Sequence, residues 1–468
     1  MAIFLLCFKI PKLDFFKGSS VTTIVKIIKP LIKTNRFFMN LKEMAKTFST
    51  NFIIMSINEV GFFAAIAIIS HHLTKDYFGN FQSFIASMSF FGALCIIGFS
   101  RFLAKYIPSL NYQQRKIEWQ NIRKVYLTII FPLITALLIC LSLIFISLVF
   151  IFNYQNFNHP FLFICFIALL ESLFSLSYIF LKSNSKYTLS TTLYSAKNFS
   201  FLILILIMWQ LSSITLYSTI ICYILCYIIT LIYFLIYKKF FYQKHHNKQK
   251  ELKNIQPINW KSYVFPYTLL SVTPYMFSAL LMIIFEVFGI NFEDQIGEFG
   301  ALLALLNLAL LAIFPLKTFT VNELAKHIED HQKTTKNLTT IILFSLTTSV
   351  ILFIVFTVIS KLLIGLMAPI YHNLLDTYRL ILVLVIFIGL NNPFSSYLAI
   401  CHNANKIIAS NIIIVLSYIF VIGGFCTYFF GLNGIIFTYF SSYFIYLGLN
   451  IFGVYKLHWL KKTIKINH

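Results

Sequence analysis

The sequence predicts an all-α polytopic membrane protein with about twelve transmembrane helices, arranged as two pseudo-symmetric six-helix lobes. Hydrophobic residues make up 59% of the 468 residues and charged residues only 11%, a balance that excludes a soluble domain of this size. The apolar residues fall in runs of roughly 20, the length that crosses about 30 Å of hydrocarbon as a helix. An internal repeat with an offset of about 218 residues divides the chain into halves.

Residues 1–47 form a basic N-terminal segment that differs from the rest of the chain. Between positions 21 and 32, apolar residues recur at helical spacing while lysines line another face, which predicts an interfacial amphipathic helix interrupted at Pro30. The apolar start of this segment is too short for a signal peptide. The alternative is that translation begins at Met39, shortly before the first membrane helix.

The remaining apolar runs predict the membrane helices and, from them, the domains. We expect an N-lobe over 48–237, a basic cytoplasmic linker over 238–261, a C-lobe over 262–455 and a basic tail over 456–468. The twelve predicted helices cover residues 49–70, 80–103, 125–150, 160–181, 191–209, 214–237, 262–288, 299–320, 338–360, 376–398, 407–429 and 434–455.

The distribution of basic residues predicts the orientation in the membrane. Of the 37 Lys and Arg residues, 34 fall at the termini or in the loops on the same side of the membrane, and this count includes Lys197 with the segment 182–198. Only Lys75, Lys361 and Arg379 fall on the other side. Because Lys and Arg accumulate in cytoplasmic loops, we expect both termini in the cytoplasm and attribute the net charge of +22 to orientation rather than to nucleic-acid binding.

Two pairs of short motifs indicate the repeat. Phe78-Gly79-Asn80-Phe81 opens the second predicted helix and Ile296-Gly297-Glu298-Phe299 opens the eighth, at an offset of 218. The stretches 178–186 and 397–406 follow the fourth and tenth helices at an offset of about 219 to 220. Since six helices return the chain to the same side, the repeat is parallel, about an axis along the membrane normal.

Several of these stretches also carry a family resemblance. The run Phe78 to Pro108, with its Phe-Gly entry, small residues and basic exit, resembles the second membrane helix of the polysaccharide transporter family of oligosaccharide-lipid flippases, which includes O-antigen flippases and belongs to the multidrug/oligosaccharidyl-lipid/polysaccharide (MOP) exporter superfamily. The stretch 370–406 and the sequence FGLNGII at 430–436 are similar to the family's approach to helix 11 and entry into helix 12. The resemblance extends over most of residues 45–455.

The resemblance implies a function that composition and spacing alone do not. It implies a transporter of the bacterial cytoplasmic membrane that moves an undecaprenyl-diphosphate-linked oligosaccharide, such as an O-antigen or capsule repeat unit, to the outer leaflet by alternating access. Glycan polymerase or chain-length proteins are the expected partners. The alternatives are a cation-coupled multidrug exporter, a lipid II flippase, which typically has fourteen helices, and a membrane glycan polymerase or ligase, which would usually need a large outer loop.

Basic residues at helix ends are the candidate substrate-binding set. They recur at corresponding places in the two halves, where they would converge on the cytoplasmic mouth of a cavity and attract a diphosphate. The alternative for each is a side chain that snorkels to the membrane surface. The candidates are Arg101, Lys105, Lys182, Lys317 and Lys406.

Two acidic residues lie within apolar runs. Glu59 is near the middle of the first predicted helix and Glu171 near the middle of the fourth. Because charge at membrane depth is costly, such residues usually face a cavity or a partner, and we expect both to face the bundle interior. They are candidates for proton or sodium coupling, and the alternative is a neutral carboxyl group hydrogen-bonded to a neighbouring helix.

No sequence motif predicts catalysis or a cofactor. The chain has no G-x-x-x-x-G-K-[ST] phosphate loop, and its eight cysteines lie singly in or beside apolar runs, so we expect neither disulfides nor a metal site. His327 and His331 have a spacing that metal ligands can have, but they lie in a charged loop. We therefore expect a transporter without cofactors and not an enzyme.

Overall fold

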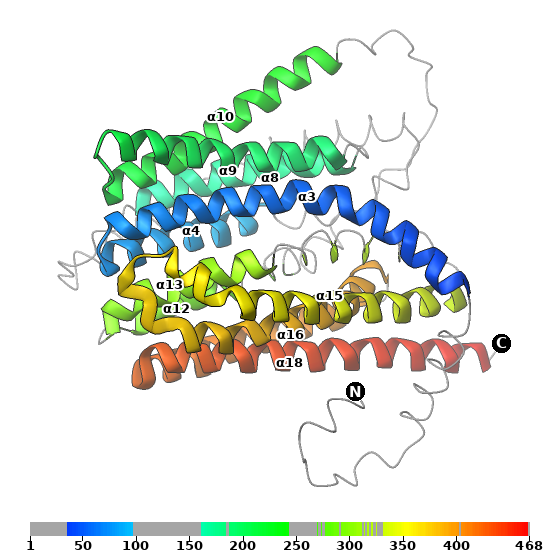
Figure 1. The fold of residues 1–468 in the computed structure, drawn as a ribbon. Coiled ribbons are helices and arrows are strands. Elements are labelled where there is room, and N and C mark those ends of the chain that lie inside the picture. Colours follow the sequence, from blue (N-terminus) through cyan, green and yellow to red (C-terminus); the bar gives the residue numbers. More distant parts are fainter. Residues whose placement is uncertain are drawn as a thin grey trace. The chain divides into compact units, whose positions relative to one another are not determined.

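A computed structural model describes the chain as almost entirely α-helical (Figure 1). It describes residues 35–96, 161–183, 187–242, 277–289, 292–310, 331–401 and 404–466, with isolated positions at 269, 273, 313, 316–317, 320–321 and 324. The chain divides into two compact units, Met1–Thr50 and Asn51–His468. Of the first unit only the helical stretch 35–50 is described, and the interiors of both lobes lie within the second.

The described part of the N-lobe consists of long helices. Thr74 caps the second of them, since its Oγ1 accepts a hydrogen bond from the Tyr77 backbone N–H at 3.5 Å, so this helix begins five residues before the predicted start. The predicted helix over 125–150 lies outside the described residues. The helices are α3 (Asn35–His72), α4 (Lys75–Cys95), α8 (Phe161–Ser183), α9 (Tyr187–Gln210) and α10 (Leu216–Tyr242).

The C-lobe helices pack around α16, which contacts α13, α15 and α18, and Figure 1 shows α15, α16 and α18 side by side. Predicted helices 9 and 10 appear as α15 and α16 with slightly longer bounds. The elements are α12 (Ala279–Phe288), α13 (Glu293–Ala309), α15 (His331–Gly365), the 3-10 helix η7 (Pro369–Leu374), α16 (Leu375–Ile400), α17 (Asn405–Tyr418), the π-helix η9 (Ile419–Gly423) and α18 (Gly424–Ile466).

The element α18 contains a chain reversal at Gly431. This glycine has φ 53° and ψ −127°, a conformation that residues with a Cβ rarely adopt. A Cβ on Gly423 would lie 3.0 Å from Cγ2 of Thr438. In a straight helix these residues would be about 22 Å apart at 1.5 Å per residue, so the chain must double back between them. The reversal separates the predicted helices 11 and 12.

The internal repeat is visible in where the helices begin. Helix α4 starts at Lys75 and α13 at Glu293, while α9 starts at Tyr187 and α17 at Asn405, and both pairs are 218 residues apart. Each motif of the first predicted pair therefore starts at the fourth residue of its helix. Equivalent positions in the two lobes can consequently be compared at this offset.

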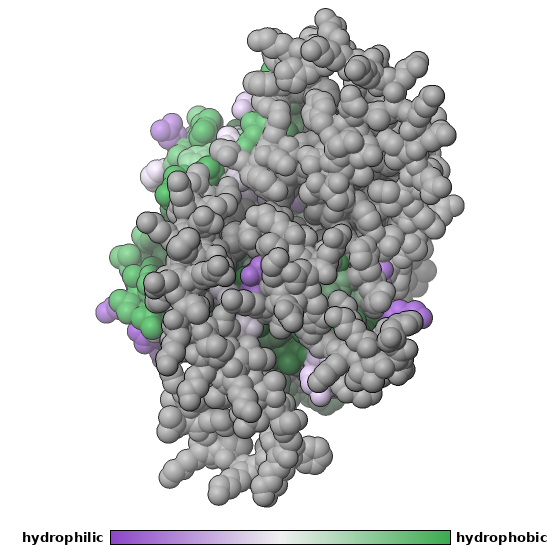
Figure 2. All heavy atoms as spheres, turned by 90° about the vertical axis from the view of Figure 1, so that its right-hand side faces the viewer, coloured by the Kyte–Doolittle hydropathy of each residue, from purple (hydrophilic) through white to green (hydrophobic). Residues whose placement is uncertain are grey.

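Apolar side chains cover much of the described outer surface. Five helices in the described part of the chain are long and apolar enough to cross a membrane. Large exposed hydrophobic residues include Ile232 on α10, Val358 on α15 and Phe444 on α18, which are 51%, 76% and 66% exposed. Where described residues reach the surface in Figure 2, hydrophobic side chains form continuous green areas. Such a surface is stable in lipid rather than in water.

Candidate functional site

The interior of the N-lobe contains a buried lysine. Lys197 lies in α9 and is only 6% exposed. Its Nζ donates a hydrogen bond to Tyr227 Oη at 3.0 Å, and Tyr223 Oη lies 3.4 Å from the same phenol oxygen. Four aromatic rings surround the ammonium at 4.7 to 5.8 Å from their centroids, a range in which cation–π attraction operates. The rings belong to Phe174, Tyr194, Tyr223 and Tyr227.

Two carboxyl groups accompany this lysine. Glu171 on α8 is 7% exposed; its Oε1 accepts from Ser175 Oγ at 3.1 Å, while its Oε2 is buried without a hydrogen bond in the described structure. Glu59 on α3 is half-buried and accepts from Asn58 Nδ2 at 3.1 Å. Both carboxyl groups interact electrostatically with Lys197. The cluster therefore joins α3, α8, α9 and α10 through charge.

A glycine on α4 makes room for Glu171. A Cβ on Gly92 would lie 2.5 Å from Cγ of Glu171 and 2.8 Å from its Cβ, so only glycine permits this approach. Helices α4 and α8 are accordingly among the most extensively packed pairs of the N-lobe. The sequence feature Phe91-Gly92-Ala93 thus positions the carboxyl group of a different helix.

The position of Lys197 corrects one part of the charge count. The sequence count assigned Lys197 to a cytoplasmic segment, but it is the eleventh residue of α9, about 15 Å along the helix axis. Its burial among aromatic rings shows that this residue belongs to the lobe interior. The assignment was wrong because the charge count treated 182–198 as one basic segment, although the predicted helix over 191–209 includes position 197 and α9 starts at Tyr187.

The interior of the C-lobe contains a cavity of about 90 Å³. Residues of α13, α16 and α18 line it, together with Phe277, Ser278 and the isolated positions 273, 313 and 317. The described lining is mainly amide, hydroxyl and aromatic, and its one charged residue is Lys317. The polar and aromatic members are Thr273, Phe277, Ser278, Asn307, Lys317, Asn391, Asn392, Ser395, Ser396, Tyr439, Tyr443 and Tyr446.

A proline-containing segment of α16 presents the amide groups to this cavity. Pro393 lies inside the helix and has no N–H, so the carbonyl of Gly389 loses its helical partner. Ser345 Oγ on α15 donates to that carbonyl at 2.6 Å and replaces the missing bond. The cost of the proline is thereby reduced, and polar residues on both sides of it remain helical.

Three buried asparagines link the cavity wall to neighbouring helices. Asn411 Nδ2 on α17 donates to Asn450 Oδ1 on α18 at 3.1 Å, and Asn450 Nδ2 donates to Asn391 Oδ1 at 2.8 Å. Asn392 is 4% exposed, yet neither its Nδ2 nor its Oδ1 has a hydrogen bond in the described structure. Ser396 Oγ, in a residue with 0% exposure, has none either. Buried polar atoms normally have partners, so these atoms are available to a ligand.

The predicted basic set is only partly described. Lys317 lines the C-lobe cavity, whereas Lys406 is exposed in the first turn of α17 and is not among the cavity residues. Lys182 lies in the last turn of α8, where its side chain lies outside the described structure, as do Arg101 and Lys105 altogether. The predicted convergence of these side chains on one cavity mouth therefore stays a prediction.

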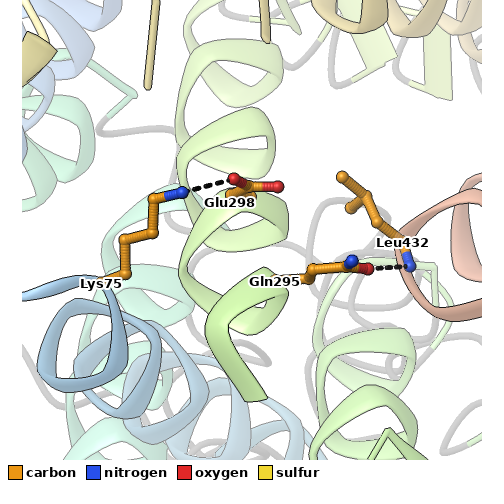
Figure 3. A network of polar contacts seen from close by, with 4 residues as sticks. All are labelled: Lys75, Gln295, Glu298 and Leu432. Carbon is orange, nitrogen blue, oxygen red and sulfur yellow. Dashed lines mark hydrogen bonds and ion pairs between the residues drawn. The ribbon is translucent and has the colours of Figure 1, made fainter. Parts of the chain in front are cut away.

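The two motifs of the repeat meet where the lobes touch. A Cβ on Gly79 would lie 2.8 Å from the backbone N of Gly297, so α4 and α13 approach closely only because both positions are glycine. Lys75 Nζ forms an ion pair with Glu298 Oε1 at 2.6 Å beside this contact (Figure 3). Figure 3 also shows Gln295 Oε1 accepting from the Leu432 backbone N–H, at 2.8 Å, next to the Gly431 reversal.

Further contacts extend this interface along the end of α3. Ala368 N–H donates to Ser70 Oγ at 3.2 Å, and the rings of Phe78 and Tyr371 lie 5.6 Å apart. Glu298 lies in α13, which begins six residues before the predicted start of the eighth helix at 299, and its side chain is only 12% exposed.

Sequence reasoning missed Lys197 and the asparagine set. A usable signal was present for both: Lys197-Asn198 leads directly into the apolar run of α9, and Asn391-Asn392-Pro393 interrupts the apolar run of α16. Polar residues at membrane depth usually mark a functional interior. Asn411 and Asn450 carried a weaker signal, since only the tertiary structure brings them to Asn391.

Comparisons with known proteins identify solved structures that share this architecture. No family model matches the sequence, and no curated protein matches it. Solved structures do match. One is a MOP superfamily transporter from Pyrococcus furiosus, described as having a binding pocket of reverse polarity that suggests a different function; it is 12% identical, with a TM-score of 0.63, and the match covers 89% of this chain and 97% of that one. The chain has the fold of the MOP superfamily transporters.

Two further solved structures have the same fold as this chain. A MATE structure in complex with MaD3S is 12% identical with a TM-score of 0.64, and covers 90% of this chain and 96% of its own. An inward-facing multidrug resistance MATE family transporter of the MOP superfamily is 11% identical with a TM-score of 0.62, and covers 88% and 99%. The predicted all-α membrane fold, with helices arranged as in this superfamily, is confirmed, and the count of twelve helices stays a prediction.

Proposed function

We propose that the chain is a membrane transporter of the bacterial cytoplasmic membrane that flips an undecaprenyl-diphosphate-linked oligosaccharide to the outer leaflet. The C-lobe cavity carries this proposal. Its described lining offers amides, hydroxyls and phenols with Lys317 as the one charge, and none of these lining residues is acidic. Such a surface suits a hydroxyl-rich glycan with an anionic headgroup and disfavours a lipophilic cation.

The basic helix ends extend the proposal to the headgroup. Arg101 offers a planar fork to phosphate oxygens, and Lys317 supplies a point charge from the other half of the repeat. Lys105, Lys182 and Lys406 add positive charge at the same side of the membrane according to the predicted orientation. Glu59 and Glu171 are the proposed coupling groups, because a buried carboxyl group can exchange a proton or bind sodium as the conformation changes.

The test is flipping of a fluorescent lipid-linked oligosaccharide by the purified protein in vesicles. Arg101→Ala and Lys317→Ala should each reduce the rate at least tenfold at equal expression, while Arg101→Lys should recover part of it. Lys361→Ala is the matched control, since Lys361 is exposed at the far end of α15 and outside the cavity. Normal flipping by both Arg101→Ala and Lys317→Ala would show that these side chains only snorkel to the membrane surface.

The second candidate is a cation-coupled multidrug exporter, which the N-lobe carboxyl groups favour. Glu59 and Glu171 are acidic groups of the kind that attract a cation, and two of the similar structures are MATE proteins. Export of ethidium from energised vesicles, abolished by Glu171→Gln, would favour this function. Absence of ethidium export alongside flipping of the lipid-linked glycan would exclude it.

A further inference from the structure

The C-lobe cavity has features of a site built for a ligand. Asn392 and Ser396 are buried and keep three polar atoms without hydrogen bonds in the described structure. Leaving such atoms unpaired is destabilising, so a folded chain retains them when a ligand completes their bonding. The Oδ1 of Asn391 is already bonded to Asn450, and its Nδ2 makes no hydrogen bond in the described structure.

The corresponding stretch of the other lobe is filled by aromatic rings. At the offsets of 218 to 220 found between the halves, Asn392 corresponds to residues 172–174 in α8, a stretch that includes Phe174. The Phe174 ring is 1% exposed and packs against Tyr194 and Tyr227. One lobe therefore fills this place with an aromatic ring, while the other leaves space beside an amide.

Aromatic rings form the wall near the amide groups. Phe277 and Tyr443 stack with centroids 3.9 Å apart and an interplanar angle of 23°, and Tyr446 lies 5.4 Å from Phe277. All three line the cavity. An aromatic face beside clustered amides and hydroxyls complements a sugar ring, which has an apolar C–H face and polar hydroxyl groups at its edge.

The size of the cavity limits the ligand. A volume of about 90 Å³ corresponds to roughly six to nine water positions at about 10–15 Å³ each. A space of this order holds one sugar ring at most, so the rest of a longer glycan would lie outside the cavity. Lys317 in the same lining adds a binding partner for a negative group attached to that ring.

We infer that the C-lobe cavity is a subsite for a single sugar ring that carries a phosphate. Asn391, Asn392 and Ser396 bind the ring hydroxyls, Tyr443 packs against the ring face, and Lys317 attracts the phosphate. This inference rests on the proposed function and deepens it, because the sugar joined to the diphosphate of the lipid carrier has this chemistry. The site would hold the first sugar of the glycan beside its headgroup.

Binding of small probes to the purified, full-length protein in nanodiscs tests the subsite without any transport step. Saturation-transfer NMR with glucose 1-phosphate should show transfer to the ring protons. Competition should rank glucose 1-phosphate about tenfold above both glucose and inorganic phosphate. Binding of glucose 1-phosphate that is no tighter than that of inorganic phosphate would overturn the subsite.

Variants separate the ring from the phosphate. Asn392→Leu should reduce the affinity for glucose 1-phosphate about tenfold and leave that for inorganic phosphate unchanged. Lys317→Gln should instead reduce the affinity for inorganic phosphate. Asn373→Leu in η7 and Lys361→Gln are the matched controls, since both positions are exposed and lie outside the cavity. Unchanged sugar binding in Asn392→Leu would contradict the assignment.

Thermal unfolding distinguishes a ligand-binding Asn392 from a purely structural one. Asn392→Leu removes unpaired polar atoms, so its melting temperature should equal or exceed that of the wild type. A lower melting temperature with unchanged probe binding would show that Asn392 is structural. Probe binding without flipping of the lipid-linked glycan would leave the subsite in place and overturn the flippase, and flipping without probe binding would do the opposite.

Discussion

The interiors of the two lobes differ, although two pairs of their helices begin at the same offset. Where the N-lobe has Lys197 on α9, the C-lobe has Val415 on α17, 218 residues later, the offset at which these two helices begin. The N-lobe interior is charged and closely filled by aromatic rings, whereas the C-lobe interior holds an amide network and a cavity. A repeated fold thus supplies two different environments, one suited to charge exchange and one to a polar ligand.

This difference also explains how each lobe satisfies its buried polar groups. In the N-lobe, the positive charge of Lys197 interacts with Glu59 and Glu171, so the lysine and each carboxyl group stabilise one another. In the C-lobe, asparagine side chains bond to one another directly. The polar atoms of Asn392 and Ser396 make no hydrogen bond in the described structure. Substitutions in the two lobes should therefore differ in the size of their effect on stability.

The largest expected effect is that of Lys197→Met in the N-lobe. Removing the ammonium leaves Glu59 and Glu171 without their cation, and breaking a buried charge pairing costs about 3–5 kcal/mol. The melting temperature of Lys197→Met should therefore lie well below that of the wild type, and thermal unfolding in detergent measures this loss.

Lys361→Met is the control for that experiment, because Lys361 is exposed and lies outside the cluster. It should unfold like the wild type. A Lys197→Met protein with wild-type stability would show that the carboxyl groups do not depend on Lys197, and would remove the contrast between the lobes.

A smaller effect is expected from Asn450→Leu in the C-lobe. This change orphans the Nδ2 group of Asn411 and the Oδ1 atom of Asn391, and each buried polar group left unpaired costs about 1–3 kcal/mol. Because no member of the network titrates near neutral pH, the loss of melting temperature should be the same at acidic and neutral pH. A loss that grew with pH would contradict an uncharged C-lobe network.

Gly297→Ala tests the contact between the lobes. A Cβ there would collide with the backbone carbonyl oxygen of Lys75, which cannot move aside as a flexible side chain can. Overpacking of this kind costs about 1–3 kcal/mol, so the melting temperature should fall. Gly365→Ala is the matched control, since a Cβ added at that glycine would meet no atom within 4 Å. Equal melting temperatures for the two variants would exclude close packing at Gly297.

The smallest effect should come from Glu298→Gln at the same interface. The ion pair with Lys75 has side chains that are 12% and 22% exposed, and partly solvated pairs contribute about 0.2–1 kcal/mol. The double-mutant cycle with Lys75→Met isolates this interaction. Its coupling energy should decrease at high salt, and a value insensitive to salt would indicate a role other than charge attraction.

The sequence by itself determined the fold class, because hydrophobic runs of membrane length and the positions of Gly and Pro are local properties. It also located the repeat at 218 residues, Glu59 and Glu171 in apolar helices, and the break near Gly431, where only glycine readily adopts the backbone conformation. The charge count grouped Lys197 with a cytoplasmic segment, since a lysine near the start of an apolar run has the pattern of a membrane boundary.

Only the tertiary structure decided which polar residues share an interior. Lys197 and Glu171 are 26 positions apart, and Asn391 and Asn450 are 59 apart, so no local pattern relates them. Their meeting depends on close helix approach, as Gly92 permits beside Glu171, and on hydrogen bonds between helices, as between Asn450 and Asn391. Hydrogen bonds and charge interactions act over a few ångströms in space, and the packing of helices, which hydropathy does not encode, sets those distances.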